Sequence, residues 1–413
     1  MMISDGEDRG WRPGIEDIIV GNKQMGRVGT GVVGVKEARE RIVELMECVL
    51  AVMMGKREWT VMDCDKEIVF CWETYRWTEN KDNKDAGGKF RSGNAKLVIK
   101  ENVHKFSLLL SILKISLSNL SSGTLSLKRE LFYLHENIAN KQEEIDAIIQ
   151  EMAYRLRLPR HSLGFVSSSK GLLSGHITVE LLNINGQNNR ERITLKPGMI
   201  ETVWKPMGYS IIDTSLLQFV LVVEKESAFF DIIQEGFLSK YPGCLLVTAR
   251  GYSDYNTKYF LRSLFESNNN IPYLYIGDYD PHGIDIYLNY AYSNKISFYE
   301  NMDLPFLEYI GIDGEQLFEQ LGKYYMPLSS EDMRKASQLL SLPQLSHPPV
   351  SVNPYPSTSI SIHRSRCNRL RRSLSTMIVQ GGKAEIEILA RGDMLIDYLS
   401  NTIHALTGII ALQ

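Results

Sequence analysis

Cysteine is scarce in this sequence, and the few cysteines lie far apart. The 413 residues include 5 cysteines and no C-x-x-C pair: Cys48, Cys64, Cys71, Cys244 and Cys367. Their odd number and wide spacing argue against a disulfide framework and against a zinc knuckle. The first residues also lack the apolar stretch of a signal peptide, so we expect a reducing intracellular compartment.

Long apolar runs and an excess of one charge are missing as well. No run approaches the roughly 18 apolar residues that indicate a membrane helix, so we expect no membrane partner. Lys and Arg number 46 against 49 Asp and Glu, and the net charge of -3 excludes a globally basic nucleic-acid-binding protein. Any DNA-binding surface must be local. The pattern G-x-x-x-x-G-K-[ST] is absent too, so we do not expect this chain itself to hydrolyse ATP.

The composition that remains is that of a globular protein, with 44% hydrophobic and 23% charged residues, and the length predicts two or three domains. Residues Gly29 to Gly34 match G-x-G-x-x-G. Because a polar loop rather than a strand precedes them, they favour a flexible N-terminal arm over a dinucleotide site. Turn-forming residues predict an exposed loop or insertion at Thr78 to Asn94 and a Pro/Ser-rich surface loop at Leu342 to Ser361.

Apolar spacing of three and four residues predicts amphipathic helices at Val35 to Met54, Val103 to Leu120 and Gln142 to Leu156. Two strand-like runs, Leu163 to Val166 and His176 to Leu182, follow and are joined by a Ser/Lys/Gly turn. This order of helix and hairpin is typical of a winged-helix module, which usually binds duplex DNA.

From Gln218 onward, short apolar strands alternate with helices. The strands F-V-L-V-V, C-L-L-V-T-A and I-P-Y-L-Y-I-G are separated by helices near Ser227 to Leu238 and Thr257 to Ser267. Continuously apolar strands separated by helices describe a parallel sheet that is covered on both faces. The predicted fold class is therefore α/β and multidomain, with a winged-helix module before the parallel sheet.

Three acidic residues stand where these strands end: Glu224 after the first strand, and Asp278 and Asp280 after the third. Ligands bind at this edge of open parallel sheets, and carboxylates gathered there repel one another unless a hard cation such as Mg²⁺ lies between them. The alternative is that Glu224 caps the following helix and that the aspartates only form a turn. Three charged neighbours are interpreted as helix-surface residues: Lys225, Glu226 and Asp285.

Tyr133 is the candidate nucleophile. Arg129 precedes it by four residues, so in a helical turn the guanidinium and the phenol share one face, which suits an arginine that holds a phosphate. A phenol needs a positioned base or a cation to attack at neutral pH. The alternative is a half-buried tyrosine that only packs, and the position in the predicted winged-helix module favours the catalytic role.

Basic residues near the same module are candidates for contacts with backbone phosphates. They are Arg155, Arg157, Arg160 and Lys170. A solvated basic face is the alternative for all four. The densest basic run, His363 to Arg372, is interpreted as an exposed segment in proximity to DNA.

These residues resemble the family formed by the A subunit of DNA topoisomerase VI and the eukaryotic meiotic double-strand-break transesterase of the sporulation-eleven type. The segment K-R-E-L-F-Y ending at Tyr133 resembles the family's nucleophile segment, and Arg160 to Leu163 with Ser168 to Gly171 resembles its wing. Three more segments resemble the two metal motifs of its Toprim fold and its C-terminal signature: V-V-E-K-E at 222–226, G-D-Y-D-P-H-G at 277–283 and K-A-E-I-E at 383–387.

The resemblance implies an N-terminal arm over residues 1–95, a CAP-like winged-helix domain over 96–200 and a Toprim domain over 205–413. It implies that Tyr133 attacks a DNA phosphodiester and remains joined to the 5′-phosphate, while Arg129 holds the phosphate. The resemblance also assigns Mg²⁺ to Glu224, Asp278 and Asp280. It further implies a homodimer in which the tyrosine of one protomer works with the metal of the other.

Within the family, the divergent N-terminal arm and the serine-rich insertion favour the meiotic branch. We therefore expect a nuclear enzyme that cuts double-stranded DNA to start recombination, with meiotic accessory proteins and a topoisomerase VI B-like subunit as partners of the homodimer. Any ATP dependence is expected to come from a partner. Two alternatives stay open: the A subunit of a type IIB topoisomerase that works in DNA relaxation or endoreduplication, and a metal-dependent Toprim nuclease that uses Tyr133 only for packing.

Overall fold

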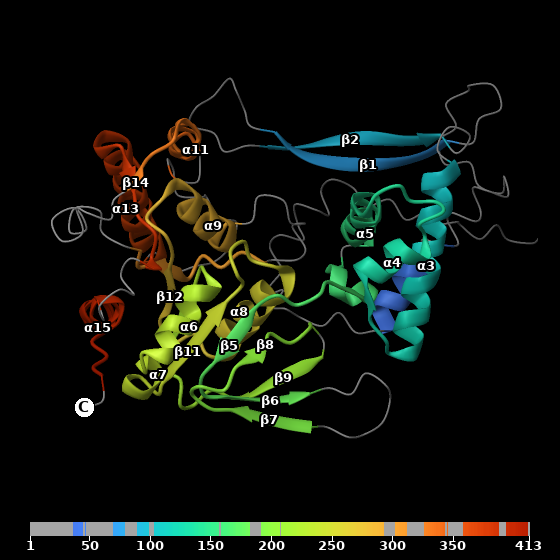
Figure 1. Cartoon of the computed structure of the whole chain (residues 1–413). Coiled ribbons are helices and arrows are strands. Elements are labelled where there is room, and N and C mark those ends of the chain that lie inside the picture. Colours follow the sequence, from blue (N-terminus) through green and yellow to red (C-terminus); the bar gives the residue numbers. More distant parts are fainter. Residues whose placement is uncertain are drawn as a thin grey trace, which may run out of the picture. The chain divides into compact units, whose positions relative to one another are not determined.

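The computed structural model describes residues 36–43, 46, 69–78, 89–98, 103–156, 158–181, 191–206, 208–292, 302–311, 326–342, 345, 358–387 and 394–411 (Figure 1). Two hydrophobic clusters organise them, one between Ala38 and Phe165 and one between Leu172 and Ile403. The G-x-G-x-x-G pattern lies outside the described residues. The first cluster ends at Phe165 and the second begins at Leu172. The predicted domain boundaries at residues 95 and 200 stay predictions. No helix in the described ranges combines the length and the apolarity needed to span a membrane.

Helices form the first cluster: α3 (Val103–Ser122), α4 (Lys128–Leu134) and α5 (Gln142–Leu156). The predicted helices at 103–120 and 142–156 are confirmed, and residues 36–43 of the predicted helix at 35–54 are helical. Ile145, Ile149 and Met152 bury one face of α5, as their spacing predicts. The Ser116 hydroxyl donates to the Leu163 carbonyl at 2.7 Å, which ties α3 to the short 3-10 helix at Arg160–Leu163.

The predicted wing hairpin is wrong within the described residues. Its first run forms β4 (Phe165–Val166), which pairs in parallel with β3 (Ser126–Leu127). Its second run forms β6 (Ile177–Leu181), which pairs with β7 (Glu191–Leu195) and β9 (Tyr209–Asp213).

A side chain distant in sequence explains why the turn between these runs does not close a hairpin. The Asn256 amide donates to the Ser167 carbonyl at 2.9 Å and to the Ser169 hydroxyl at 2.7 Å. The chain then enters β5 (Leu172–Ser174), which pairs with a strand of the central sheet. Residues 167–174 are therefore held by the second cluster.

The loop predicted at Thr78 to Asn94 is also partly wrong. Residues 89–94 belong to β2 (Lys89–Val98), which pairs antiparallel with β1 (Val69–Thr78) from Val69↔Val98 to Thr78↔Lys89. Gly93 and Asn94 favour turns by themselves, but the ladder pairs them with Thr74 and Glu73. Pairing with a second strand has overridden the local preference.

A six-stranded sheet forms the centre of the second cluster, in the order β13-β12-β10-β11-β5-β8. Its four parallel strands are β10 (Phe219–Val223), β11 (Cys244–Thr248), β12 (Tyr273–Ile276) and β13 (Leu307–Tyr309). The predicted buried parallel sheet is confirmed, since every residue of β10, β11 and β12 is buried. The sequence did not predict the two antiparallel strands, β5 and β8 (Glu201–Thr202), that extend it beyond β11.

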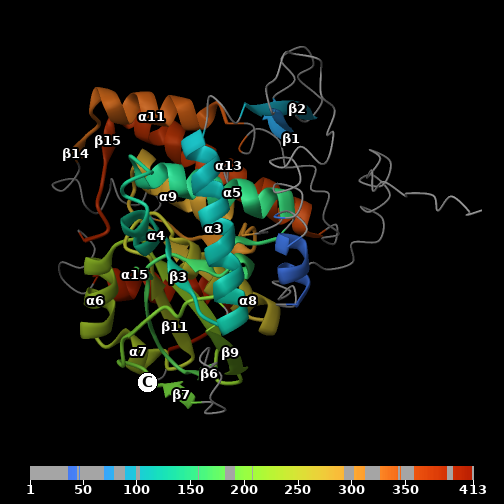
Figure 2. The ribbon, with the colours of Figure 1, turned by 90° about the vertical axis from the view of Figure 1, so that its right-hand side faces the viewer.

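Helices cover both faces of this sheet. The chain moves from β10 to β11 through α6 (Glu226–Gln234) and α7 (Phe237–Lys240), and returns past β10 to β12 through α8 (Tyr255–Ser267). Because these crossovers run in opposite directions along the sheet, right-handed connections put α6 and α8 on opposite faces. Figure 2 shows the two helices on either side of β11.

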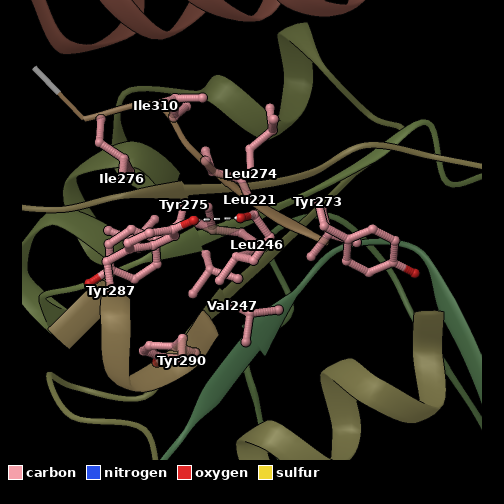
Figure 3. Close-up of a cluster of buried hydrophobic side chains, with 14 of the residues drawn as sticks. Leu221, Leu246, Val247, Tyr273, Leu274, Tyr275, Ile276, Tyr287, Tyr290 and Ile310 are labelled. Atoms are coloured by element: carbon pink, nitrogen blue, oxygen red, sulfur yellow. Dashed lines mark hydrogen bonds between the residues drawn. The ribbon is translucent and has the colours of Figure 1, made fainter. Parts of the chain in front are cut away.

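Buried tyrosines fix the next helix, α9 (Pro281–Ala291), to the sheet. Tyr287 and Tyr290 of α9 lie with Tyr275 of β12, with ring centroids 5.3 and 5.4 Å from that of Tyr275 (Figure 3). The Tyr287 hydroxyl donates to the Leu307 carbonyl of β13 at 2.9 Å. These contacts hold the first turn of α9 at the carboxyl edge of the strands.

Three helices follow in the described C-terminal part: α11 (Ser330–Leu340), α13 (Thr358–Gln380) and α15 (Met394–Thr407). The strand β14 (Met326–Pro327), just before α11, pairs antiparallel with β15 (Gly382–Lys383), just after α13. The surface loop predicted at 342–361 is wrong from Thr358, where α13 begins, and at Leu345, which is buried. Most of the remaining positions of that loop lie outside the described residues.

The basic run on α13 has a structural role that the sequence did not indicate. Arg366 is 5% exposed and donates to the Glu308 carboxylate at 3.0 Å and to the Pro305 carbonyl at 2.6 Å. Arg369 pairs with the other oxygen of Glu308 at 2.6 Å. The expectation that this run is simply exposed is therefore wrong for these two residues, whose partners precede or belong to β13.

We predict that Arg366→Met lowers the free energy of unfolding by about 2–3 kcal/mol, because it leaves one oxygen of the partly buried Glu308 carboxylate and the Pro305 carbonyl without their Arg366 donor. Arg372→Met is the matched control on an exposed position of the same helix and should change stability by less than about 0.5 kcal/mol. Chemical denaturation of both variants measures the difference. Equal effects would contradict the assigned role of Arg366.

Candidate active site

The ends of two neighbouring parallel strands bring acidic side chains to one edge. Glu224 directly follows β10, and its N–H donates to the Ile276 carbonyl at the end of β12 at 3.0 Å. Asp278 follows β12 by two residues. Asp280 is the N-cap of α9 and accepts from the Gly283 N–H at 2.6 Å. The topology therefore places all three predicted acids at the carboxyl edge of the sheet.

Glu224 and Asp278 are in direct contact. The Asp278 N–H donates to Glu224 Oε2 at 3.0 Å, and both residues are 5% exposed. Side chains are disfavoured at two glycines beside them: a Cβ at Gly277 would lie 2.3 Å from Glu224 Oε2, and one at Gly283 would lie 2.6 Å from the Asp278 carbonyl oxygen and 3.0 Å from Glu224 Oε2. The glycines of the G-D-Y-D-P-H-G segment therefore make room for the glutamate.

The alternative explanation, in which the acids only cap helices or form turns, holds for Asp280 but not for Glu224. Glu224 does not cap α6, because Lys225 occupies the N-cap position and makes no side-chain cap. Asp280 does cap α9, so turn formation accounts for part of its role. Neither capping nor turn chemistry explains why Glu224 is buried against Asp278.

Burial and mutual repulsion make these carboxylates hard to ionise. Burial raises the pKa of Glu224 to about 8, with the nearby charges of Asp278 and Asp280 acting in the same direction and the Asp278 N–H and Lys225 opposing them. Burial raises the pKa of Asp278 to about 6, although the Ile386 N–H and Lys225 oppose the increase. A cation at this edge would stabilise the charged forms.

Lys225 belongs to the site, so its interpretation as a helix-surface residue is wrong. Its Nζ lies 2.9 Å from Asp278 Oδ2 and 2.9 Å from Glu387 Oε2. The Ile386 N–H donates to Asp278 Oδ1 at 2.9 Å. The K-A-E-I-E segment was the only sequence signal for these contacts, and no local pattern connects it with residue 225.

The donor set suits a hard divalent cation without forming a closed cage. Among the side chains described, no group of three His, Cys, Asp or Glu residues is arranged around one ion position. Mg²⁺ is commonly bound through one or two carboxylates, with waters and substrate phosphates as the other ligands. Two buried, mutually repelling carboxylates at an open sheet edge fit that mode of binding.

The helix α4 presents the candidate nucleophile. Leu131 is buried and fixes one face of α4, while Lys128 Nζ lies 2.8 Å from the Asp146 carboxylate of α5. On the other face, Tyr133 is 62% exposed and Arg129 is exposed. The alternative of a half-buried packing tyrosine is therefore wrong. No hydrogen bond or ion pair in the described parts of the chain joins Tyr133 or Arg129 to the three acids.

Two of the four predicted DNA-contacting residues, Arg160 and Lys170, have described side chains. The Arg160 guanidinium lies 4.9 Å from the centroid of the Tyr255 ring, and Lys170 is exposed. Arg155 lies in α5, whose backbone is described at that position, and Arg157 lies outside the described residues. Their contact with phosphates stays a prediction.

Two family models match the chain and together cover more than half of it. The model of the Toprim domain shared by Spo11 and the A subunit of topoisomerase 6 matches residues 219–403, and the model "Type IIB DNA topoisomerase" matches residues 104–165. The three acids and the K-A-E-I-E segment fall in the first match, and Arg129 and Tyr133 fall in the second. Toprim domains generally bind divalent metal ions, and the carboxylate oxygens at the sheet edge are of the type that such ions prefer.

Curated relatives are similar to part of the chain. The meiotic recombination protein SPO11 of Mus musculus is 27% identical over 266 residues, 63% of this chain and 64% of the relative. The meiotic recombination protein spo-11 of Caenorhabditis elegans is 32% identical over 189 residues, 45% of this chain and 42% of the relative. The A subunit of DNA topoisomerase 6 from Arabidopsis thaliana is 26% identical over 226 residues, 52% of this chain and 49% of the relative. The chain thus spans less than two thirds of each of these relatives.

The matches agree with the order of parts along the chain. A helical module with an exposed tyrosine comes first, and a Toprim sheet with acids at its carboxyl edge follows. The chain belongs to the family of Spo11 and the A subunit of topoisomerase VI.

Proposed function

We propose that this chain cleaves DNA as a transesterase, with Tyr133 as the nucleophile and with Glu224, Asp278 and Asp280 as ligands of Mg²⁺. The observation that carries the proposal is the exposure of Tyr133, 62% free on a helix that is anchored through the buried Leu131. A tyrosine used for packing would be buried, whereas an attacking phenol must be reachable by a phosphodiester.

In the proposed reaction, the Tyr133 oxygen forms a bond to the DNA phosphorus and the bond from phosphorus to the 3′-oxygen breaks. The phenol loses its proton, the 3′-oxygen gains one, and the protein keeps the 5′-phosphate, so no water is consumed. Arg129, one turn before Tyr133, is suited to hold the phosphate through two parallel hydrogen bonds. Bound Mg²⁺ would supply charge stabilisation to the phosphate oxygens.

The two halves of the site are proposed to meet in a homodimer. Within the described chain no polar contact joins Tyr133 to the acids, and a second copy offers the missing half. Two copies related by a two-fold axis match the two strands of a duplex, so that each protomer cuts one strand. We place duplex binding in the α3–α5 module, with Arg155, Arg157, Arg160 and Lys170 on backbone phosphates.

The biological role that fits best is the start of meiotic recombination in the nucleus. The names of several relatives, which are meiotic recombination proteins, support this role. A B-like topoisomerase VI subunit would then supply any ATP hydrolysis, and meiotic accessory proteins would complete the assembly. The second candidate is the A subunit of a type IIB topoisomerase, favoured by the match to the Arabidopsis thaliana protein of that kind.

Tyr133→Phe is expected to reduce the covalent DNA adduct to background, because it removes only the attacking oxygen. The full chain, recovered with its partners from meiotic cells in denaturing detergent, is tested for end-labelled oligonucleotides that stay attached. A chelator present before lysis should also suppress new adduct.

Tyr252→Phe is the control, because Tyr252 is another exposed tyrosine, at 51%. Its adduct yield should match that of the unmodified chain. Loss of the adduct in Tyr252→Phe with retention in Tyr133→Phe would reassign the nucleophile. Free DNA ends without any attached protein would instead favour the metal-dependent nuclease.

The pKa of Glu224 is raised to about 8 from an ordinary 4.5. This shift predicts how the stability of the metal-free protein, kept so by a chelator, depends on pH. A carboxyl whose pKa is raised on folding contributes stability at low pH, and this contribution is lost as the pH rises through its folded value. The free energy of unfolding should therefore fall by a few kcal/mol between about pH 5 and 8. Glu224→Gln should flatten this dependence. Unfolding curves at several pH values measure it, and parallel curves for both proteins would show that Glu224 is not the group.

A further inference from the structure

The segment from Gly382 to Glu387, here called the strap, is fixed at its start. β15 pairs with β14, and Lys383 Nζ lies 2.8 Å from the buried Asp332 carboxylate at the beginning of α11. Burial alone would raise the pKa of Asp332, but hydrogen bonds from Lys383 and Ser329 bring it to about 2. The anchor is therefore an ion pair over the whole neutral range.

The strap next joins the turn that carries the acids. The Tyr279 N–H donates to the Ala384 carbonyl at 2.9 Å, and the Ala384 N–H donates back to the Tyr279 carbonyl at 3.0 Å. Tyr279 is the residue between Asp278 and Asp280. Ala384 is 1% exposed and Ile386 is fully buried, so the strap is packed into the core beside this turn.

Both oxygens of Asp278 then have a partner that depends on the strap. Asp278 Oδ1 accepts the Ile386 N–H at 2.9 Å, and Asp278 Oδ2 pairs with Lys225 Nζ at 2.9 Å. Lys225 is in turn held by Glu387, 2.9 Å away, and Glu387 accepts the Ser227 hydroxyl at 2.7 Å. A continuous chain of charged contacts thus runs from Asp278 through Lys225 to Glu387.

The two glutamates of the strap differ in how firmly they are bound. Glu387 is 30% exposed and makes two short contacts, which outweigh the effect of burial and leave its pKa below the ordinary value. Glu385 is 53% exposed and lies 3.8 Å from Lys225 Nζ. Lys225 therefore has one tightly bound acidic neighbour, Glu387, and one weakly bound acidic neighbour, Glu385, two positions apart in the sequence.

We infer that Lys225 and Glu387 are positioning residues for Asp278, and that the strap is part of the site because it supplies Glu387 and the Ile386 N–H. This inference rests on the proposed function, which assigns Asp278 to a divalent cation. Partners behind a metal ligand fix its orientation, and their removal weakens binding even though they do not touch the ion. Each residue of K-A-E-I-E makes one of these contacts. They are the ion pair of Lys383 with Asp332, the backbone bonds of Ala384 with Tyr279, the distant approach of Glu385 to Lys225, the Ile386 N–H bond to Asp278 and the ion pair of Glu387 with Lys225.

Binding of Mn²⁺ to the purified full chain without DNA, followed by the electron paramagnetic resonance of free Mn²⁺, tests the inference. Glu387→Gln should weaken binding about tenfold, as loss of a partner behind a metal ligand commonly does. Glu385→Gln removes the same charge from the same segment and should change binding less than about twofold. Equal effects of the two variants would overturn the inference, because a general loss of negative charge would then be sufficient.

A double-mutant cycle asks whether Glu387 acts through Lys225. If it does, Glu387→Gln added to Lys225→Met causes no further change in Mn²⁺ affinity. An undiminished effect in that background would overturn the assignment. Ser227→Ala removes the other partner of Glu387 and should weaken binding in the same direction, so the test remains available if Glu387→Gln does not fold. Unchanged binding in Ser227→Ala and Glu387→Gln together would reject the positioning role.

Failure of this inference can be distinguished from failure of the proposed function. An unmodified chain that binds no Mn²⁺ would overturn the inference and the metal assignment together. Normal Mn²⁺ binding and a normal difference between the two glutamates, with no covalent adduct in cells, would reject the transesterase and leave the positioning role in place.

Discussion

Two carboxylates that are both buried at one sheet edge repel each other, and the rest of the site compensates for that repulsion. Glu224 and Asp278 cannot separate, because parallel β10 and β12 are neighbours and the Asp278 N–H is bonded to Glu224. The compensation comes from backbone N–H donors, from the Lys225 ammonium and from protonation of Glu224. A hydrophobic sheet edge would fold more easily, and a cost to stability of this kind is typical of functional sites.

The proposed nucleophile, Tyr133, has the opposite environment. Tyr133 is solvent-exposed on a seven-residue helix whose other face is anchored by Leu131 and Lys128. In the proposed reaction, exposure leaves the phenol accessible to a large substrate, whereas the buried acids are already held in place by their neighbours. Separating the two requirements on different hydrophobic clusters allows each to be met without compromising the other.

The sequence predicts what depends on neighbours along the chain. Apolar runs identify β10, β11 and β12, periodic spacing identifies α3 and α5, and the strand ends locate Glu224, Asp278 and Asp280 at one edge. These predictions succeed because each strand is buried along its whole length. The position of the acids then follows from the general rule for parallel sheets.

Features decided by distant partners could not be predicted from local patterns. In the sequence, Lys225 resembles a surface lysine and Arg366 resembles an exposed cation. Only the structure shows that Lys225 pairs with Glu387 and that Arg366 pairs with Glu308. The wing prediction failed for the same reason, because Asn256 holds the segment that would have formed the turn. A single sequence supplies no local signal for such pairs, and only the family signature K-A-E-I-E indicated that one of these regions mattered.

The antiparallel strands β5 and β8 have a practical consequence for dissecting the protein. β5 pairs with the edge of β11 and β8 pairs with β5, and both strands precede the matched Toprim region, which begins at residue 219. A fragment cut at the start of that region would expose the unpaired backbone of β11, a strand that is otherwise buried along its whole length, and such an edge is a template for aggregation. Any Toprim fragment of this chain that is meant to fold by itself should therefore begin before Leu172, so that β5 and β8 remain at that edge of the sheet.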